Sequence, residues 1–162
     1  MRLYHGSNTE IETIDLSRGR QGKDFGSGFY TSADYMQAVE FTSNVIRREG
    51  KGIPTVTSFE FDESAFEKLN VKRFEGYTKE WAEFILANRQ NDTGRPIHSY
   101  DIVIGPMADE NIYSYISDFI NGIISREKFW KLIKYGCPTH QIVFCTNEAL
   151  NCAKFIDYRE II

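Results

Sequence analysis

The sequence predicts an α+β fold with a mainly antiparallel β-sheet core flanked by helices. Strand-like and helical segments are interleaved along the chain, but they lack the regular βαβ rhythm of a doubly wound sheet. Of the 162 residues, 41% are apolar and 14% are aromatic, which is enough for one sizeable core. We therefore expect residues 1–162 to form a single domain.

The first third of the chain predicts two strands separated by a long loop, and then a helix. Arg2 to His5 is a short β-prone stretch, whereas the polar, glycine-containing segment from Asn8 to Asp24 is typical of an exposed loop. Gly26 to Tyr30 predicts the second strand. Ser32 can then cap a helix. The expected apolar face of this helix consists of Met36, Val39, Val45 and Ile46.

The middle of the chain mixes both kinds of element. Thr55 to Phe61 and Val71 to Glu75 are rich in β-branched and aromatic residues and predict two further strands. Thr78 is placed to cap a helix. The buried face of that helix is indicated by Trp81, Phe84 and Ile85 at positions i, i+3 and i+4.

The last third predicts strands at both ends of a helical region. Tyr100 to Ile104 is β-branched and is expected to stop at Gly105-Pro106, and two helical patterns then meet near Gly122. Their apolar faces are Ile112/Ile116/Phe119 and Phe129/Leu132/Ile133. The remaining expected elements are a strand from Gln141 to Cys145, a helical turn capped by Thr146 and a β-prone end from Phe155 to Ile162.

Charge and the amino terminus indicate a cytoplasmic protein without a membrane segment. The formal net charge of -4 arises from interspersed acidic and basic residues, without a run of one sign that would favour nonspecific binding to nucleic acid or membranes. The opening residues Met1 to His5 turn polar at once and lack the apolar core of a signal peptide. No apolar run reaches the length of a membrane span.

The cysteines argue against a disulfide framework. Cys137, Cys145 and Cys152 are odd in number and lack C-x-x-C spacing, which indicates reduced thiols. Together with His140 they leave open a thiol enzyme or a metal site, although they match no standard ligand spacing. We therefore expect no metal.

Two segments contain residue types suited to holding a flat, hydroxyl-bearing ligand. In the stretch from Asp24 to Tyr30, flexible glycines precede an aromatic residue, so the backbone can approach a ligand closely while a ring stacks on it. A dinucleotide-binding G-x-G-x-x-G loop is not formed, because Thr31 stands where the third glycine is needed. His5 precedes Gly6, and its ring could bind a ligand hydroxyl. Taken alone, each segment is explained more simply by a structural role.

These residues carry a resemblance to a known family. Tyr4-His5-Gly6-Ser7 resembles the first motif of the poly(ADP-ribose) polymerase branch of the ADP-ribosyltransferases. In that family the histidine contacts a ribose hydroxyl of NAD and the glycine holds the nicotinamide carboxamide through its backbone. The resemblance thus implies that His5, Gly6 and Ser7 form part of an NAD site.

The second motif of the family resembles Gly28-Phe29-Tyr30, whose tyrosine would stack on nicotinamide. Phe41 follows Tyr30 by the spacing of the family's second stacking aromatic residue. The resemblance implies that nicotinamide lies between these two rings. Ala38 departs from the family, because the polymerases have a carboxamide-binding serine at this position.

The third motif resembles His140-Gln141-Ile142-Val143-Phe144, a strand that in the family begins with the catalytic glutamate. Here that glutamate is Gln141. Together with the segment from Asp101 to Pro106, this arrangement is similar to an uncharacterised bacterial branch of the transferases, and the likeness covers nearly the whole chain. It implies the split sheet of that family, with His5, Tyr30 and Gln141 as catalytic residues.

The change at Gln141 implies a particular activity. A glutamine can still bind the ribose, but it carries no charge and cannot act as a general base. Because chain elongation in the family needs the glutamate, we expect transfer of single ADP-ribose units. Asp24, Glu40 and Asp109 are candidates for a compensating acid, although each is more simply interpreted as a solvated charge.

The acceptor is left open by the sequence. It could be a protein, a nucleic acid or water, the last making the chain an NAD hydrolase, and the loops around Asn8 to Lys23 and Asp109 to Asn111 would decide. Bacterial relatives of this branch resemble toxins or defence effectors that are paired with a small neutralising antitoxin. The main alternative is a module that binds NAD or ADP-ribose without catalysis.

Overall fold

The computed structural model of the chain describes residues 1–134 and 139–162. In that part of the chain, a three-stranded sheet has the order β1-β3-β7 and a four-stranded sheet has the order β2-β6-β5-β4. The strands are β1 (Arg2–Ser7), β2 (Phe29–Thr31), β3 (Thr55–Phe61), β4 (Val71–Arg73), β5 (Ile102–Pro106), β6 (His140–Phe144) and β7 (Ala153–Glu160). The helices are α1 (Tyr35–Glu49), α2 (Ala65–Lys68), α3 (Lys79–Arg89), α4 (Glu110–Ile120), α5 (Arg126–Ile133) and α6 (Asn147–Leu150), with a 3-10 turn at Leu16–Arg18.

The α+β class and the mainly antiparallel pairing are confirmed. All neighbouring strands of both sheets run antiparallel except β4 and β5, which are parallel. The two sheets approach each other at an isolated bridge between Tyr4 and Ser32. Reciprocal backbone hydrogen bonds of 2.8 and 2.9 Å form this bridge.

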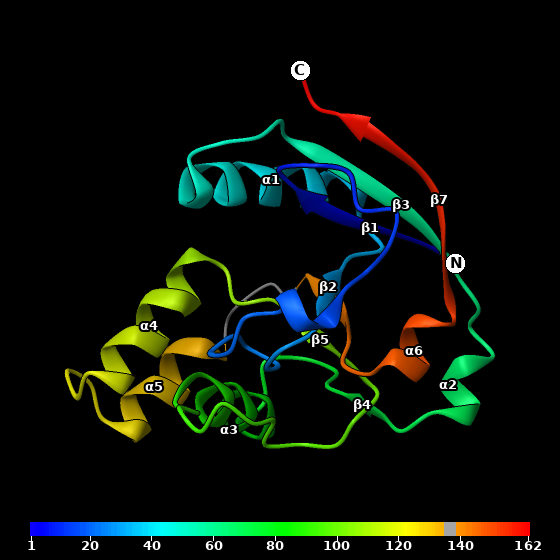
Figure 1. Cartoon of the computed structure of the whole chain (residues 1–162). Coiled ribbons are helices and arrows are strands. Elements are labelled where there is room, and N and C mark those ends of the chain that lie inside the picture. Colours follow the sequence, from blue (N-terminus) through cyan, green and yellow to red (C-terminus); the bar gives the residue numbers. More distant parts are fainter. Residues whose placement is uncertain (135–138) are drawn as a thin grey trace.

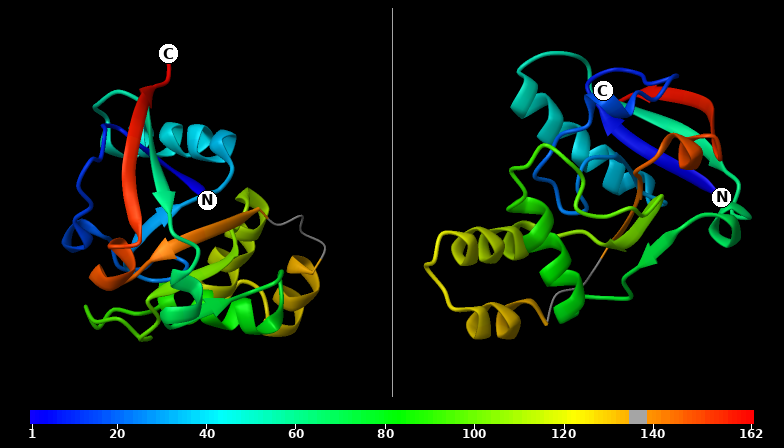
Figure 2. Two further views of the ribbon diagram at one scale, coloured as in Figure 1. Left: turned by 90° about the vertical axis from the view of Figure 1, so that its right-hand side faces the viewer. Right: turned by 60° about the horizontal axis from the view of Figure 1, so that its bottom comes forward.

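The layers follow from the side-chain alternation of the central strands. In β5, Ile102 and Ile104 belong to one core cluster with Leu3 and Phe59 of the other sheet. Val103, between them, points to the opposite side and joins a second cluster that contains Trp81. The first cluster thus fills the space between the sheets, and the second lies under α3, α4 and α5. Figures 1 and 2 show these three helices grouped on one side and α1 beside β1 and β3 on the other.

Helix α1 differs in its details from the sequence prediction. Its N-cap is Asp34, whose carboxylate accepts hydrogen bonds from the first turn, and not Ser32. The Ser32 hydroxyl instead accepts from the backbone nitrogen of Asp34 at 3.0 Å. Met36, expected on the apolar face, is 59% exposed. The face that packs is made by smaller side chains, namely Ala38, Thr42 and Val45.

Other boundaries shift by one or a few residues. Strand β5 starts at Ile102 and includes Gly105 and Pro106, which were expected to end it. Proline is tolerated there because it is the last residue of the strand, beyond the stretch that pairs with β4. The short helix α2 was not predicted. The caps at Thr78 and Thr146 are confirmed, since their hydroxyls accept from the backbone nitrogens of Trp81 and Ala149.

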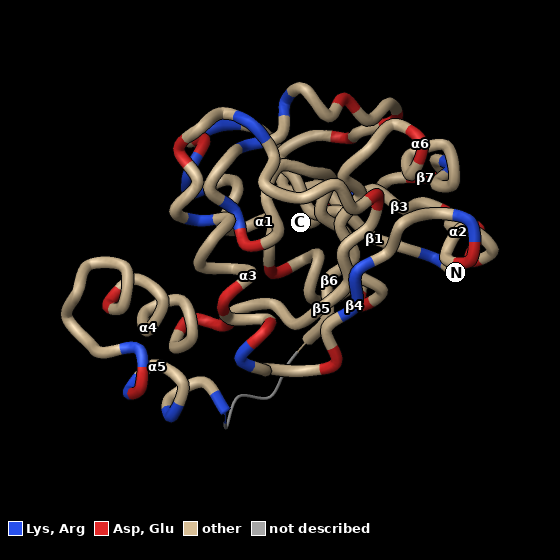
Figure 3. The backbone as a smooth tube through the Cα atoms, turned by 90° about the horizontal axis from the view of Figure 1, so that it is seen from below, with Lys and Arg blue, Asp and Glu red and all other residues tan. Residues whose placement is uncertain are grey.

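Acidic and basic positions are mixed over the helices and loops seen in Figure 3. Among the described residues, no helix is long and apolar enough to cross a membrane.

Candidate functional site

Two adjoining cavities bring the predicted residues together. The smaller has a volume of about 40 Å³ and the larger about 430 Å³, and Gly6 and Phe41 line both. The larger is within the size range of small-molecule sites. The smaller cavity is lined by Tyr4, Gly6, Tyr30, Thr31, Ser32, Gln37, Ala38, Phe41, Met107 and Gln141.

His5 has a fixed tautomer. It lies in β1, its ring is stacked on Phe29 with centroids 4.2 Å apart, and its Nδ1 is 2.7 Å from the carbonyl oxygen of Tyr30. Because a carbonyl can only accept, Nδ1 carries the proton. Burial lowers the pKa of His5 to about 4 despite that hydrogen bond. The ring is therefore neutral at pH 7, and Nε2 is left as an acceptor suited to a hydroxyl donor.

The depressed pKa of His5 predicts acid sensitivity. The unfolded chain binds this proton with a pKa near 6.5 and the folded protein with a pKa of about 4, so the unfolded state gains protons first as the pH falls. The contribution of neutral His5 to the free energy of unfolding is fully present above pH 6.5 and is lost as the pH drops towards 4. Between pH 7 and 4 we expect His5 alone to lower the free energy of unfolding by up to about 3 kcal/mol. Urea unfolding of the wild type and His5→Gln across this range tests it, since equal pH slopes would contradict the prediction.

Tyr30 is held through its hydroxyl by the preceding turn. The hydroxyl donates to the carbonyl oxygen of Gly26 at 2.6 Å and accepts from the backbone nitrogen of Phe25 at 3.0 Å. Burial raises the pKa of Tyr30 well above its ordinary value, so the proton that makes the first bond stays in place. The Nζ of Lys23 lies 4.6 Å from the ring centroid. Burial, together with the neighbouring arginines, lowers the pKa of Lys23 to about 8.

A buried ion pair anchors this turn to the helical layer. The Nε and a terminal nitrogen of Arg89 in α3 lie 2.6 and 2.5 Å from Oδ1 of Asp24. The guanidinium also lies over the ring of Tyr113 in α4, 4.2 Å from its centroid. His98 adds a second anchor, because its Nε2 is 2.9 Å from the carbonyl oxygen of Phe25. This support for Tyr30 was not predicted, since nothing in the sequence links residues that far apart.

Breaking the ion pair should loosen the turn under Tyr30. Both side chains are about 85% buried, so removing one partner leaves the other charge without compensation. We expect Asp24→Asn to lower the free energy of unfolding by about 3 kcal/mol. The double variant Asp24→Asn, Arg89→Gln should show a clearly smaller decrease in the free energy of unfolding than Asp24→Asn alone. Urea denaturation of both proteins measures this, and equal losses would show that the pair contributes nothing as a pair.

Gly6 allows β1 and α1 to approach each other closely. A Cβ atom at this position would overlap the carbonyl oxygen of Ala38 and lie 3.2 Å from the backbone nitrogen of Thr42. The contact brings Ala38 and Phe41 of α1 to the wall of the smaller cavity. Gly28 has a similar role at the start of β2, because a Cβ there would lie 2.8 Å from the carbonyl oxygen of Phe144.

Gln141 is the polar group that the smaller cavity leaves unsatisfied. It lies in β6 opposite Gly105 of β5, and only 5% of its surface is exposed. Its Nε2 has no hydrogen-bond partner, the only such buried side-chain atom in residues 1–134 and 139–162. A buried amide without a partner costs about 1–3 kcal/mol, so Nε2 is expected to meet a partner from outside the chain, an ordered water or a ligand.

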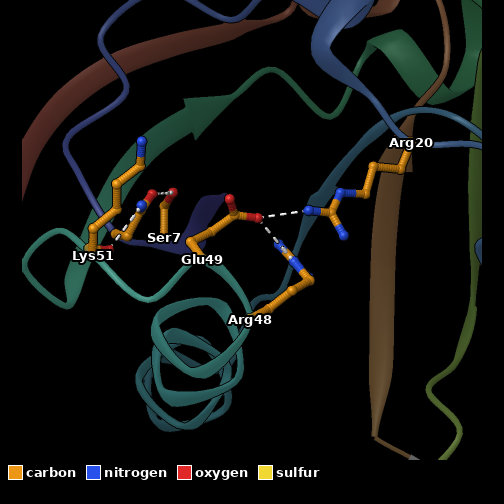
Figure 4. A network of polar contacts seen from close by, with 6 residues as sticks. Ser7, Arg20, Arg48, Glu49 and Lys51 are labelled. Atoms are coloured by element: carbon orange, nitrogen blue, oxygen red, sulfur yellow. Dashed lines mark hydrogen bonds and ion pairs between the residues drawn. The ribbon is translucent and has the colours of Figure 1, made fainter.

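The larger cavity is lined by charged side chains. Glu49 accepts from Arg20 at 2.6 Å and from Arg48 at 3.0 Å, as Figure 4 shows. Lys23 and Lys51 line the same cavity. The basic residues outnumber the acidic ones on this wall, which suits an anionic group. The cavity also takes in His5, Ser7 and Gly28 from the predicted site.

None of the three candidate compensating acids lines the smaller cavity. Asp24 is paired with Arg89, Asp109 caps α4, and Glu40 is exposed on α1. Residues of this cavity that the sequence prediction missed are Thr31, Ser32, Gln37 and Met107. Met107 directly follows β5, so the β-branched pattern that predicted this strand did not extend to it.

In the part of the chain that the structure describes, no arrangement of side chains supports the alternative of a thiol enzyme or a metal site. Cys137 lies outside the described residues. Cys145 is partly buried, and burial raises the pKa of its thiol to about 12, which makes it a poor nucleophile. Among the described residues, no group of three His, Cys, Asp or Glu side chains could hold a metal ion.

Fold and site define an α+β protein of two sheets, with aromatic rings and an unsatisfied amide around a cleft between β1, β2, β6 and α1. The model of a family described as "Protein of unknown function (DUF3990)" matches residues 1–155. The chain belongs to this family. Comparison with curated proteins and with solved structures gave no match.

Proposed function

We propose that this protein is an NAD-dependent mono-ADP-ribosyltransferase with the split-sheet fold of that enzyme class. It would transfer ADP-ribose from NAD to a macromolecular acceptor, a protein or a nucleic acid, and release nicotinamide. By analogy with the bacterial branch that it resembles, it would act in the cytoplasm as a toxin or defence effector and be neutralised by a small antitoxin.

The observation that carries the proposal is the meeting of four distant segments at one cavity. Gly6, Tyr30, Phe41 and Gln141 come from β1, β2, α1 and β6, and all four line the smaller cavity. The sequence resemblance assigns an NAD contact to each of them independently. The orphaned Nε2 of Gln141 adds a reason for a ligand that rests on physical chemistry alone.

The residues around the two cavities offer partners for the parts of NAD in order. Tyr30 and Phe41 offer aromatic surfaces for nicotinamide, and the Gly6 backbone could hold its carboxamide. The Nε2 of His5, on the larger cavity, would accept from a ribose hydroxyl of NAD, and Gln141, on the smaller cavity, could donate to the nicotinamide ribose. The basic wall of the larger cavity would then face the diphosphate.

The reaction would proceed at the C1′ atom of the nicotinamide ribose. The C1′–N bond breaks and its electrons leave with nicotinamide, so positive charge builds on the sugar. An acceptor oxygen or nitrogen then bonds to C1′ and loses its proton to solvent. Gln141 would orient the ribose without supplying charge, which favours slow transfer of single units. Water in the acceptor's place would give NAD hydrolysis.

A second candidate is a module that binds NAD or ADP-ribose without turnover. Its specific support is that no Asp or Glu belongs to the described residues that line the smaller cavity. Binding of NAD without any release of nicotinamide would favour this candidate over the transferase.

The test is incubation of the protein with NAD labelled in its adenylate part and a bacterial cell extract. Label that resists nuclease but not protease identifies a protein acceptor, and the reverse identifies a nucleic acid. Matched samples use a His5→Ala, Tyr30→Ala double variant and, as a control, Ile97→Ala, which changes an exposed side chain that lines neither cavity. Equal background labelling by wild type and the double variant, with no nicotinamide released by either, would overturn the proposal.

A further inference from the structure

A third cavity lies on the α1 side of the β1-β3-β7 sheet, next to the candidate NAD site. It has a volume of about 260 Å³, and Tyr4 lines both this cavity and the smaller one described above. Its lining is Arg2, Tyr4, Tyr35, Ser58, Asp157, Tyr158 and Arg159. None of these residues except Tyr4 contributes to the NAD cavities, so the transferase proposal leaves the others without a role.

The strand register places these groups in order. Tyr4, Ser58 and Asp157 are direct neighbours across β1, β3 and β7, so they form one row on the same face. Arg2 lies two residues before Tyr4 on one outer strand, and Arg159 lies two residues after Asp157 on the other. The two arginines therefore flank the row on opposite sides, separated by roughly 13 Å along the strands.

An aromatic pair borders the row. The rings of Tyr4 and Tyr35 meet edge to face, with centroids 5.3 Å apart and planes inclined by 83°. Tyr35 is the first residue of α1, and it covers the Tyr4 end of the row. Because both side chains are only partly buried, their rings offer surface on which a planar group can pack.

The charges in this cavity have no protein partners. Within residues 1–134 and 139–162, Arg2, Arg159 and Asp157 take part in no ion pair, whereas Glu60, opposite Arg2, shares the amino terminus with Glu63, each at 3.4 Å. Among the residues that line the cavity, two guanidinium groups stand against one carboxylate, so the lining itself carries a net positive charge. Such a pocket favours an anionic ligand, and it disfavours an arginine side chain, which Asp157 and the tyrosines could otherwise hold.

We propose that this cavity binds a guanine nucleotide unit of single-stranded nucleic acid and presents the strand to the NAD site as the acceptor. The base would pack on Tyr4 and Tyr35. The carboxylate of Asp157 would accept from the adjacent ring N–H and amino group of guanine, a pair of donors that no other standard base offers. Arg2 and Arg159 would contact the phosphates on either side. The role as acceptor rests on the proposed transferase function, but binding does not.

The test measures binding of fluorescent five-nucleotide strands, without NAD, by anisotropy. Strands with a central G in a U background are compared with strands carrying A or C, in RNA and in the corresponding DNA. We expect the G strand to bind at least tenfold more tightly, and Asp157→Asn to reduce this preference below threefold. Tighter binding of RNA or of DNA identifies the source of the strand.

The arginines should act differently from the carboxylate. Arg2→Gln and Arg159→Gln should each weaken all strands about equally and lower the salt dependence by about one phosphate contact. Arg47→Gln, the same charge change at an exposed position on α1, serves as the matched control and should have no such effect. All these positions are exposed, so the substitutions should leave the fold intact. Circular dichroism of each variant verifies this.

Absence of binding at low salt would overturn the proposal, as would equal effects of Arg2→Gln and Arg47→Gln. Binding of an arginine-rich peptide that depends on Asp157, with no binding of the strands, would replace it with a protein acceptor. Nicotinamide release from NAD is measured separately with the wild type in the presence of the bacterial cell extract, which supplies the acceptor. If nicotinamide release is absent but the strands bind, the transferase proposal fails and the nucleotide site stands. If release occurs but the strands do not bind, the nucleotide site fails and the transferase proposal stands.

Discussion

Gln141→Leu is expected to make the free protein more stable and to remove its response to NAD. The substitution replaces a buried amide that lacks a partner for Nε2 with an apolar side chain of similar size. Relief of that unsatisfied donor should raise the free energy of unfolding by about 1–2 kcal/mol. Wild-type protein at a hundred times the dissociation constant of NAD should gain about 2.7 kcal/mol from the ligand, whereas the variant should gain much less.

Urea unfolding with and without NAD measures both effects, and Gln141→Glu provides the informative comparison. A carboxylate at this position would face the ribose where positive charge develops, so nicotinamide release should rise on the order of a hundredfold if the site is catalytic. A Gln141→Leu protein that is less stable than wild type would show that the amide makes a structural contact instead. An unchanged response to NAD would remove Gln141 from the site.

Much of the fold was predictable because local chemistry decides it. β-branched and aromatic residues predicted β3 at its observed bounds, and the capping residue Thr78 with the apolar spacing behind it predicted α3. The errors occur where tertiary packing overrides local preference. Met36 is exposed because it lies roughly 200° around α1 from Ala38, on the side away from β1. The face that packs is selected by the close contact with Gly6, far away in the sequence.

The candidate site was predictable only in part, for a similar reason. The resemblance selected His5, Tyr30, Phe41 and Gln141, and the structure brings these residues to two adjoining cavities. The residues that orient them come from elsewhere. No pattern in the sequence pairs Asp24 with Arg89, because such a contact depends on how α3 packs against the loop before β2. Single positions were therefore accessible from the sequence, whereas their supports were not.

Gly6→Ala is expected to damage both stability and NAD binding, although it adds a single methyl group. Its Cβ would overlap the carbonyl oxygen of Ala38 and crowd the backbone nitrogen of Thr42. Both are backbone atoms of α1, so no side-chain rotation relieves the overlap and the helix itself must move away from β1. We expect the free energy of unfolding to fall by about 3 kcal/mol, at the upper end of the usual cost of overpacking.

The same movement should open the candidate site, because Ala38 and Phe41 lie on the displaced helix and line the smaller cavity. The apparent affinity for NAD, derived from the thermal shift, should then fall at least tenfold. This loss should also be seen at temperatures where the variant is still folded. Gly76→Ala is the matched control, since an added Cβ there meets nothing within 4 Å, and it should leave both measurements unchanged. If Gly6→Ala behaved like Gly76→Ala, the close approach of β1 and α1 could not be what shapes the cavity. A loss of stability with intact NAD affinity would instead show that the contact between Gly6 and α1 serves stability alone. The cavity would then have kept its shape although the helix was strained.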